Sequence, residues 1–187
     1  MSPAFPLLVI CVGSDRATGD SLGPLVGTFL TWSGFPGKVL GTLDNPVHAG
    51  NLETTLEEIK GERVTVLGVD ACLGVKAEVG TIIVRQGSLK PGLGVKKKLP
   101  PVGDLHIAGV VNVGGFMEYT VLQNTRLGLV MKMAQTIASG IVEAEQRLRG
   151  LASSRTSGPV LPQRFTHGVP MNDEPRLLPL PVFDRQR

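Results

Sequence analysis

The chain has little cysteine and no long hydrophobic run, and each shortage excludes a class of protein. Its 187 residues include two cysteines, Cys11 and Cys72, which are too few for the disulfide framework of a small secreted protein. No apolar run approaches the ~20 residues of a membrane span. The first residues lack the basic start of a signal peptide, and the apolar run 7–12 is too short for its hydrophobic part. We therefore expect a protein of the reducing cytoplasm with no membrane partner.

The chain also has little excess charge where it is expected to fold. Residues 1–150 hold 14 basic and 13 acidic side chains, so no broad basic field indicates nucleic-acid binding. The one dense basic run is Lys96–Lys98. Such a run is usually a solvated loop, although in a hydrolase it could steer an acidic polypeptide. Six of the 14 prolines fall in residues 151–187. We predict one domain over 1–150 and a disordered, Pro-rich tail over 151–187.

Apolar runs alternate with helical patterns in the first seventy residues. The predicted strands are 7–12, 38–43 and 64–69, and the predicted helices run from about 20 to 32 and from 52 to 60. This alternation is typical of an α/β fold with a parallel sheet. Residues 79–85 and 105–113 follow as strands with no helix between them, which predicts an antiparallel or mixed edge. After Gly114 and Gly115 comes the longest helix, whose apolar stripe runs from Leu127 to Leu148.

Two aspartates, Asp20 and Asp70, come at or just after the predicted ends of buried strands. The carboxyl ends of parallel strands meet in one crevice, so these carboxylates should lie close together. Repulsion between them would raise one pKa and leave one acid and one base, the pair that a hydrolase needs. The same pair could instead bind a metal. The structural alternatives are that Asp20 or Ser21 caps the next helix and that Asp70 caps a turn.

Other side chains are weaker candidates. His48 follows the second predicted strand, so it could orient a water, bind a metal with the two aspartates, or hydrogen-bond Asp44 within the loop. His106 lies inside a predicted strand. Cys72 could be a nucleophile, but the neighbouring Asp70 would raise its pKa and weaken it. The loop from Gly13 lacks the Lys-Ser or Lys-Thr of a P-loop and is not GxGxxG, which argues against nucleotide binding.

Three stretches, 13–27, 41–49 and 112–127, closely resemble the YyaC-type sporulation proteins of endospore-forming bacteria. The likeness extends over residues 7–146. That group is similar to the spore germination protease, which degrades small acid-soluble spore proteins, and more distantly to the hydrogenase maturation proteases. The resemblance implies a three-layer α/β/α fold with a mostly parallel twisted sheet, of the phosphorylase/hydrogenase-like type. It also implies that Asp20, in the stretch Asp20–Pro24, and Asp70, in Val69–Cys72, match the two catalytic aspartates of the germination protease.

We therefore expect an endopeptidase of sporulation or germination, acting on spore proteins in the forespore or mother-cell cytoplasm. Asp20, Asp70 and His48 would be catalytic, with no cofactor; the protein could form a homo-oligomer. One alternative is a metal-dependent protease of the hydrogenase-maturation type, in which the same three residues hold one divalent ion and His106 is a rival ligand. The other is a non-catalytic adaptor of spore assembly. The chain is much shorter than the germination protease, so substrate recognition can differ.

Overall fold

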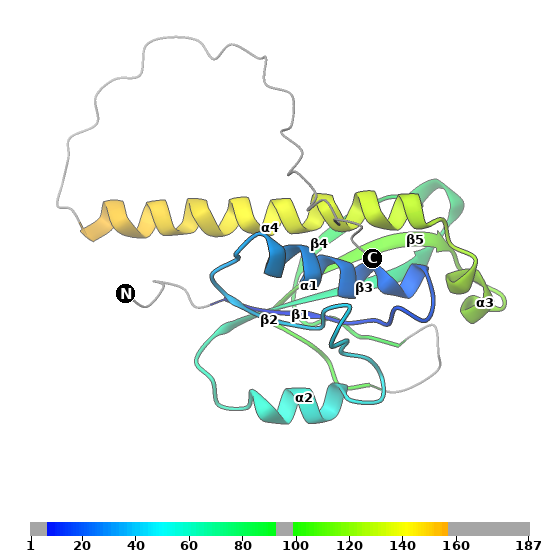
Figure 1. Cartoon of the computed structure of the whole chain (residues 1–187), viewed down its shortest axis with the longest axis horizontal. Coiled ribbons are helices and arrows are strands. Elements are labelled where there is room, and N and C mark those ends of the chain that lie inside the picture. Colours follow the sequence, from blue (N-terminus) through cyan, green and yellow to red (C-terminus); the bar gives the residue numbers. More distant parts are fainter. Residues whose placement is uncertain (1–6, 93–98, 157–187) are drawn as a thin grey trace, which may run out of the picture. The chain divides into compact units, whose positions relative to one another are not determined.

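The computed structural model describes residues 7–92 and 99–156, whose strands form one five-stranded sheet in the order β2-β1-β3-β5-β4 (Figure 1). The strands are β1 (Leu7–Cys11), β2 (Lys38–Leu40), β3 (Thr65–Gly74), β4 (Ile82–Gln86) and β5 (Leu105–Val113). All neighbours are parallel except β4 and β5, which pair antiparallel at one edge. The sequence-based prediction of a mostly parallel sheet with an antiparallel edge is confirmed.

Helices cover both faces of this sheet. Helices α1 (Leu22–Trp32) and α4 (Leu127–Thr156) pack together over one face, and α2 (Leu52–Glu58) lies on the other (Figure 1). Three short elements complete the fold: η1 (Gly19–Ser21), η2 (Lys76–Glu78) and α3 (Glu118–Gln123). The arrangement is the predicted α/β/α sandwich. In the part of the chain that the structure describes, no helix has the length and hydrophobicity that crossing a membrane requires.

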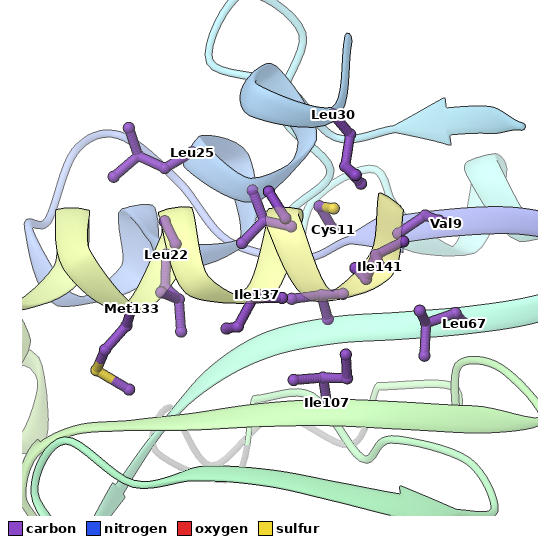
Figure 2. Packing of buried hydrophobic residues seen from close by; sticks show 14 of the residues in the cluster. Val9, Cys11, Leu22, Leu25, Leu30, Leu67, Ile107, Met133, Ile137 and Ile141 are labelled. Atoms are coloured by element: carbon purple, nitrogen blue, oxygen red, sulfur yellow. The ribbon is translucent and has the colours of Figure 1, made fainter. Parts of the chain in front are cut away.

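The larger core lies between the sheet and the pair α1 and α4. Figure 2 shows aliphatic side chains of both helices meeting the strands. The contributing side chains include Leu22, Leu25 and Leu30 of α1, Met133, Ile137 and Ile141 of α4, and Val9, Leu67 and Ile107 of the sheet. Burying each such side chain stabilises the fold by about 1.5–3 kcal/mol. The smaller core lies under α2 and is formed by residues such as Leu8, Ile10 and Leu52.

Two strand ends differ from the prediction, and both differences shape the site. Strand β2 stops at Leu40 because Gly41 takes a positive φ of 88°. Strand β3 does not end at residue 69 but continues to Gly74, because β5 supplies partners for it from Leu67 to Gly74. Asp70 therefore lies inside β3, opposite Ala108 of β5, and not at the end of its strand.

The C-terminal helices also differ in their limits. Phe116, Met117 and Tyr119 were expected in the first turns of the long helix or in the approach to it; they lie in the approach, where Met117 adopts a left-handed conformation (φ 50°) and α3 forms separately. The apolar stripe of α4 is buried over Val130–Ile141, but its ends at Leu127 and Leu148 are exposed. Helix α4 runs to Thr156, past the predicted boundary at residue 150. The rest of the predicted tail, 157–187, lies outside the described residues.

Candidate active site

A pocket of about 390 Å³ lies at the carboxyl end of the parallel strands, and Asp20, His48 and Asp70 all line it. The chain passes from β1 outward to β2 and then returns across β1 to β3, so the direction of winding reverses between β1 and β3. A crevice opens at such a reversal because the connections on its two sides diverge. Asp20 follows β1 and Asp70 belongs to β3, which places one carboxylate on each side of the reversal.

Close backbone contacts hold Asp20 against the end of β1. A Cβ on Gly13 would lie 2.0 Å from the backbone oxygen of Asp20, and a Cβ on Gly23 would lie 2.0 Å from the backbone oxygen of Val12. Any side chain at either position would push η1 and α1 away from the strand. The Ser14 amide also donates to the Asp20 backbone oxygen at 3.1 Å. The glycines of the first motif thus serve backbone packing.

The capping roles considered for Asp20 and Ser21 are not present. Neither residue makes a side-chain hydrogen bond to the free amides at the start of its helix. The Ser21 hydroxyl instead donates to the backbone oxygen of Thr18 at 2.6 Å. The carboxylate of Asp20 is therefore left at the pocket wall, half-buried, without the structural task that its sequence position suggested.

Asp70 is the first residue of β3 beyond the last paired residue of β1. Val69 pairs with Cys11, and the Val12 amide then donates to the Val69 backbone oxygen at 2.7 Å. Only 8% of Asp70 is exposed. One carboxylate oxygen, Oδ1, accepts a hydrogen bond from the Ala71 amide at 2.8 Å. This bond stays within the strand, so it is not the turn cap that the sequence allowed.

Electrostatics separates the two carboxylates. Burial raises the pKa of Asp70 well above its usual range, and the charge of Asp20 raises it further, against a smaller opposing effect of the Ala71 amide. Burial also raises the pKa of Asp20, while the Ser14 amide lowers it and His48 lowers it further when its ring is protonated. Asp70 therefore favours its protonated form while Asp20 is ionised, so the pair contains one acid and one base.

His48 lies in the loop between β2 and α2 and is half-buried at the pocket. Its ring nitrogen Nδ1 accepts a hydrogen bond from the Gly50 amide at 3.0 Å. Its own backbone amide donates to Oδ1 of Asn51 at 2.8 Å. The bonds that fix this loop thus run to Gly50 and Asn51 and not to Asp44, the partner considered from the sequence.

The other sequence candidates lie elsewhere or are chemically unsuited. His106 pairs with Gly68 and Arg85 in the sheet, and its Nδ1 lies 2.8 Å from the Gly87 backbone oxygen, away from the residues that line the pocket. The pKa of Cys72 is raised by burial and by Asp70 and Glu78, which makes its thiol a poor nucleophile. Lys96–Lys98 lies outside the described residues.

Sequence reasoning missed the far wall of the pocket. Arg16, from the loop that also carries Asp20, lines it, and so do Pro91, Leu99 and Tyr119 from further along the chain. No sequence pattern joins such distant loops. The one available signal was Tyr119, the only tyrosine in the chain, which is largely exposed at the start of α3 together with the nearby Phe116 and Met117.

Comparisons with known proteins agree with this architecture. The family model described as "Protein of unknown function (DUF1256)" matches residues 3–140. The chain is 54% identical over 139 residues to the "Uncharacterized protein YyaC" of Bacillus subtilis (strain 168), across 73% of this chain and 68% of that protein. The chain belongs to the DUF1256 family, and the resemblance to YyaC-type proteins is confirmed.

Solved structures similar to this chain include two proteins from Thermococcus kodakarensis. The [NiFe] hydrogenase maturation protease HycI from Thermococcus kodakarensis superimposes with a TM-score of 0.54 at 20% identity, covering 78% of this chain and 95% of that one. The maturation protease HybD from the same organism gives a TM-score of 0.48 at 14% identity, covering 78% and 99%. The likeness to HycI shows that the chain has the fold of a hydrogenase maturation protease.

Proposed function

We propose that this member of the DUF1256 family is an endopeptidase in which Asp20 and Asp70 share the acid–base work of peptide hydrolysis. The observation that carries the proposal is the meeting of two carboxylates from distant elements in one pocket, where burial and mutual repulsion set their proton affinities apart. A pair of carboxyl groups with separated pKa values is the usual arrangement for acid–base hydrolysis.

The two carboxyl groups divide the reaction as follows. Ionised Asp20 accepts a proton from a water molecule whose oxygen forms a bond to the carbonyl carbon of the substrate. Protonated Asp70 gives its proton to the amide nitrogen as the carbon–nitrogen bond breaks, which releases the amine. The products are a carboxylic acid and an amine, and the proton now on Asp20 returns to Asp70 or to solvent before the next turnover. Proton transfers by such positioned groups typically contribute 10²–10⁴-fold to the rate.

The rim of the pocket supports a polypeptide substrate. Tyr119 lines the pocket, while Phe116 is 82% exposed and Met117 is largely exposed just before it. Large apolar side chains exposed together are unusual unless they contact a partner. A peptide with a bulky apolar side chain next to the scissile bond would cover them. Following the resemblance to sporulation proteins, we infer that the substrates are small acid-soluble spore proteins in the cytoplasm of a spore-forming bacterium.

The test is cleavage of purified small acid-soluble spore proteins, followed by mass spectrometry from roughly pH 5 to 8. Wild type should release defined fragments, and both Asp20→Asn and Asp70→Asn should abolish them. Asp15→Asn is the matched control, because Asp15 is exposed in the same loop and does not line the pocket. Equal loss in the control would indicate a general disturbance of the loop.

Two outcomes of this test would favour the alternative functions, a metal-dependent protease or an adaptor. If a chelator abolishes cleavage and zinc restores it, the protein is a metal-dependent protease. If wild type cleaves no spore protein at any pH, with or without metal, endopeptidase activity on these substrates is wrong. Retention of the same proteins on immobilised wild type would then favour an adaptor.

A further inference from the structure

The loop that carries His48 fixes the orientation of the imidazole ring. The Gly50 amide donates to Nδ1 at 3.0 Å, and the absence of a side chain at Gly50 permits this approach. A Cβ there would lie 3.0 Å from the Cε1 atom of His48 and 3.2 Å from Nδ1. On the backbone side, Asn51 accepts from the His48 amide through Oδ1 and donates to the Pro46 backbone oxygen through Nδ2. The Gly50 amide thus fixes the ring of His48, and the Asn51 side chain fixes the backbone of the same tight turn.

This orientation determines which ring nitrogen carries the proton. A backbone amide can only donate, so Nδ1 of His48 must be an acceptor without a proton. The proton of the neutral imidazole then lies on Nε2, which makes Nε2 a donor. A histidine that binds a metal through Nε2 shows the opposite arrangement, in which Nδ1–H donates to a carbonyl or carboxylate oxygen.

His106 supplies the contrast within the same chain. Its Nδ1 lies 2.8 Å from the Gly87 backbone oxygen, so Nδ1 carries the proton and Nε2 is free to accept. That tautomer suits metal binding, but His106 is not among the residues that line the pocket. His48, which lines the pocket, therefore has a protonated Nε2 that can donate a hydrogen bond. His106 has a free Nε2 that could bind a metal, but it does not line the pocket.

The remaining side chains give no better fit to a metal. Among residues 7–92 and 99–156, no three His, Cys, Asp or Glu side chains are grouped so that they could hold an ion. The metal site implied by the hydrogenase maturation proteases therefore does not fit the residues that the structure describes.

We propose that His48 is a fixed hydrogen-bond donor, which presents Nε2–H to the carbonyl oxygen of the scissile peptide, and not a metal ligand. The substrate side of this assignment rests on the proposed function; the tautomer and the lack of metal binding do not. Negative charge grows on the carbonyl oxygen as water adds to the carbon, and a donor already in place stabilises it. His48 transfers no proton in this step, which leaves the acid–base work to the two aspartates.

The first experiment reads the tautomer directly, by long-range ¹H–¹⁵N correlation spectra of the uniformly ¹⁵N-labelled full chain near neutral pH. His48→Gln and His106→Gln assign the signals. The His48 ring should show a protonated Nε2 and an unprotonated Nδ1, and the His106 ring should show the reverse. A His48 ring protonated on Nδ1 would overturn the proposal.

The second experiment uses Zn²⁺ alone, titrated calorimetrically into wild type, His48→Ala and Asp20→Asn. The three proteins should bind zinc equally weakly, without a one-to-one site. A tight one-to-one site in wild type that both variants lose would show that His48 is a metal ligand after all. This result and the tautomer do not depend on cleavage, so they stand even if the chain proves to have no peptidase activity.

The third experiment separates a donor from a merely structural residue. His48→Ala should lower kcat by about 10²–10³-fold with little change in KM, because the lost bond strengthens only in the transition state. His48→Gln keeps an N–H donor at a similar distance from the backbone, so its kcat should be at least about tenfold higher than that of His48→Ala. Equal kcat in the two variants, with both folded by circular dichroism, would contradict the donor role.

Discussion

Two cavities lie at opposite ends of the same parallel strands. One is the pocket that holds Asp20 and Asp70, and the other is a larger cavity under α4. The cavity, of about 490 Å³, lies at the amino ends of β1, β3 and β5 beneath the middle of α4. Its walls are mainly aliphatic, with Leu67, Ile107 and Ile137 among them. The polar pocket is smaller, at about 390 Å³, but it contains the two candidate carboxylates, Asp20 and Asp70. The one carboxylate that lines the larger cavity, that of Glu145, is paired with Arg149. Size alone would have pointed to the end of the molecule without candidate catalytic groups.

The difference arises from how the strands end. At the amino ends, α4 spans the sheet, and its apolar stripe meets strand residues that are apolar in turn. At the carboxyl ends, β1 stops at Cys11 while β3 continues to Gly74, so the second half of β3 loses one neighbour. Asp70 is the first residue of β3 that has no paired residue in β1. Because β3 extends beyond β1, polar side chains can occupy the space next to β3. If the two strands ended together, apolar core residues would fill that space.

The largest expected difference between the two ends is in activity. Asp70→Asn should reduce kcat/KM for cleavage of spore proteins by about 10²–10⁴-fold, because the amide cannot protonate the leaving nitrogen. The fold should persist, since the Ala71 amide can still donate to the oxygen of the new side chain. Ile137→Ala, at the other end, should leave kcat/KM per folded molecule within about twofold. Comparable losses in both variants would mean that the two ends are not functionally distinct.

Stability should show the reverse order. Ile137 is 3% exposed in the main core, so Ile137→Ala should lower the free energy of unfolding by about 2–5 kcal/mol, measured by urea titration. Leu127→Ala is the matched control on the same helix, because Leu127 is 57% exposed, and it should change stability by less than about 0.5 kcal/mol. A loss under 1 kcal/mol for Ile137→Ala would show that α4 contributes little to the core.

The pH dependence of stability should also come from the polar end. The raised pKa of Asp70 means that the folded chain keeps a proton which the unfolded chain releases near pH 4. Stability falls with rising pH wherever the folded state binds more protons. The free energy of unfolding should therefore decline from about pH 4 up to the raised pKa, by about 1.4 kcal/mol for each unit of elevation.

Variants can assign this decline to its source. Asp70→Asn should flatten it, leaving only the part due to Asp20, whereas Ile137→Ala should lower the whole curve without changing its slope. Urea unfolding at several pH values measures both. An unchanged slope in Asp70→Asn would show that this carboxyl has an ordinary pKa.

The smallest expected effect concerns the rim. Phe116→Ser removes an exposed apolar contact for the substrate, so KM should rise about three- to tenfold while kcat and the melting temperature stay nearly constant. Trp32→Ser is the control, because Trp32 is also exposed but lies at the far end of α1, outside the pocket. Equal KM values for Phe116→Ser and wild type would remove the rim from substrate binding.

The sequence predicts best where a residue's role depends on its own segment. Strand β5 was predicted with its observed limits, because its apolar run is bounded by turn residues on both sides. The extension of β3 to Gly74 was missed because it depends on pairing with β5, which lies more than thirty residues further along the chain. The left-handed Met117 was also missed, since a residue other than glycine rarely takes that conformation.

The site shows the same limit. Asp20 and Asp70 could be paired from sequence because parallel strands bring their carboxyl ends together. The capping role considered for Asp20 is not observed, because Asp20 lies inside the 3₁₀ turn η1, which precedes α1, and no side chain makes a capping hydrogen bond at either helix start. The tautomer of His48 depends on the Gly50 amide, and Tyr119 reaches the pocket from another helix. No local sequence pattern predicts either the tautomer of His48 or the position of Tyr119.

The glycine contacts around β1 have a consequence for how related chains are interpreted. Gly13, Gly23 and Gly27 each have another backbone within about 2 Å of where a Cβ would stand. Natural selection must therefore retain these glycines for folding alone, whether or not the chain still turns over a substrate. A homologue that keeps them is shown to share the scaffold, and nothing more. On the proposed function, a homologue that retains the glycines but has lost Asp20, Asp70 or His48 would keep the fold without the catalytic activity.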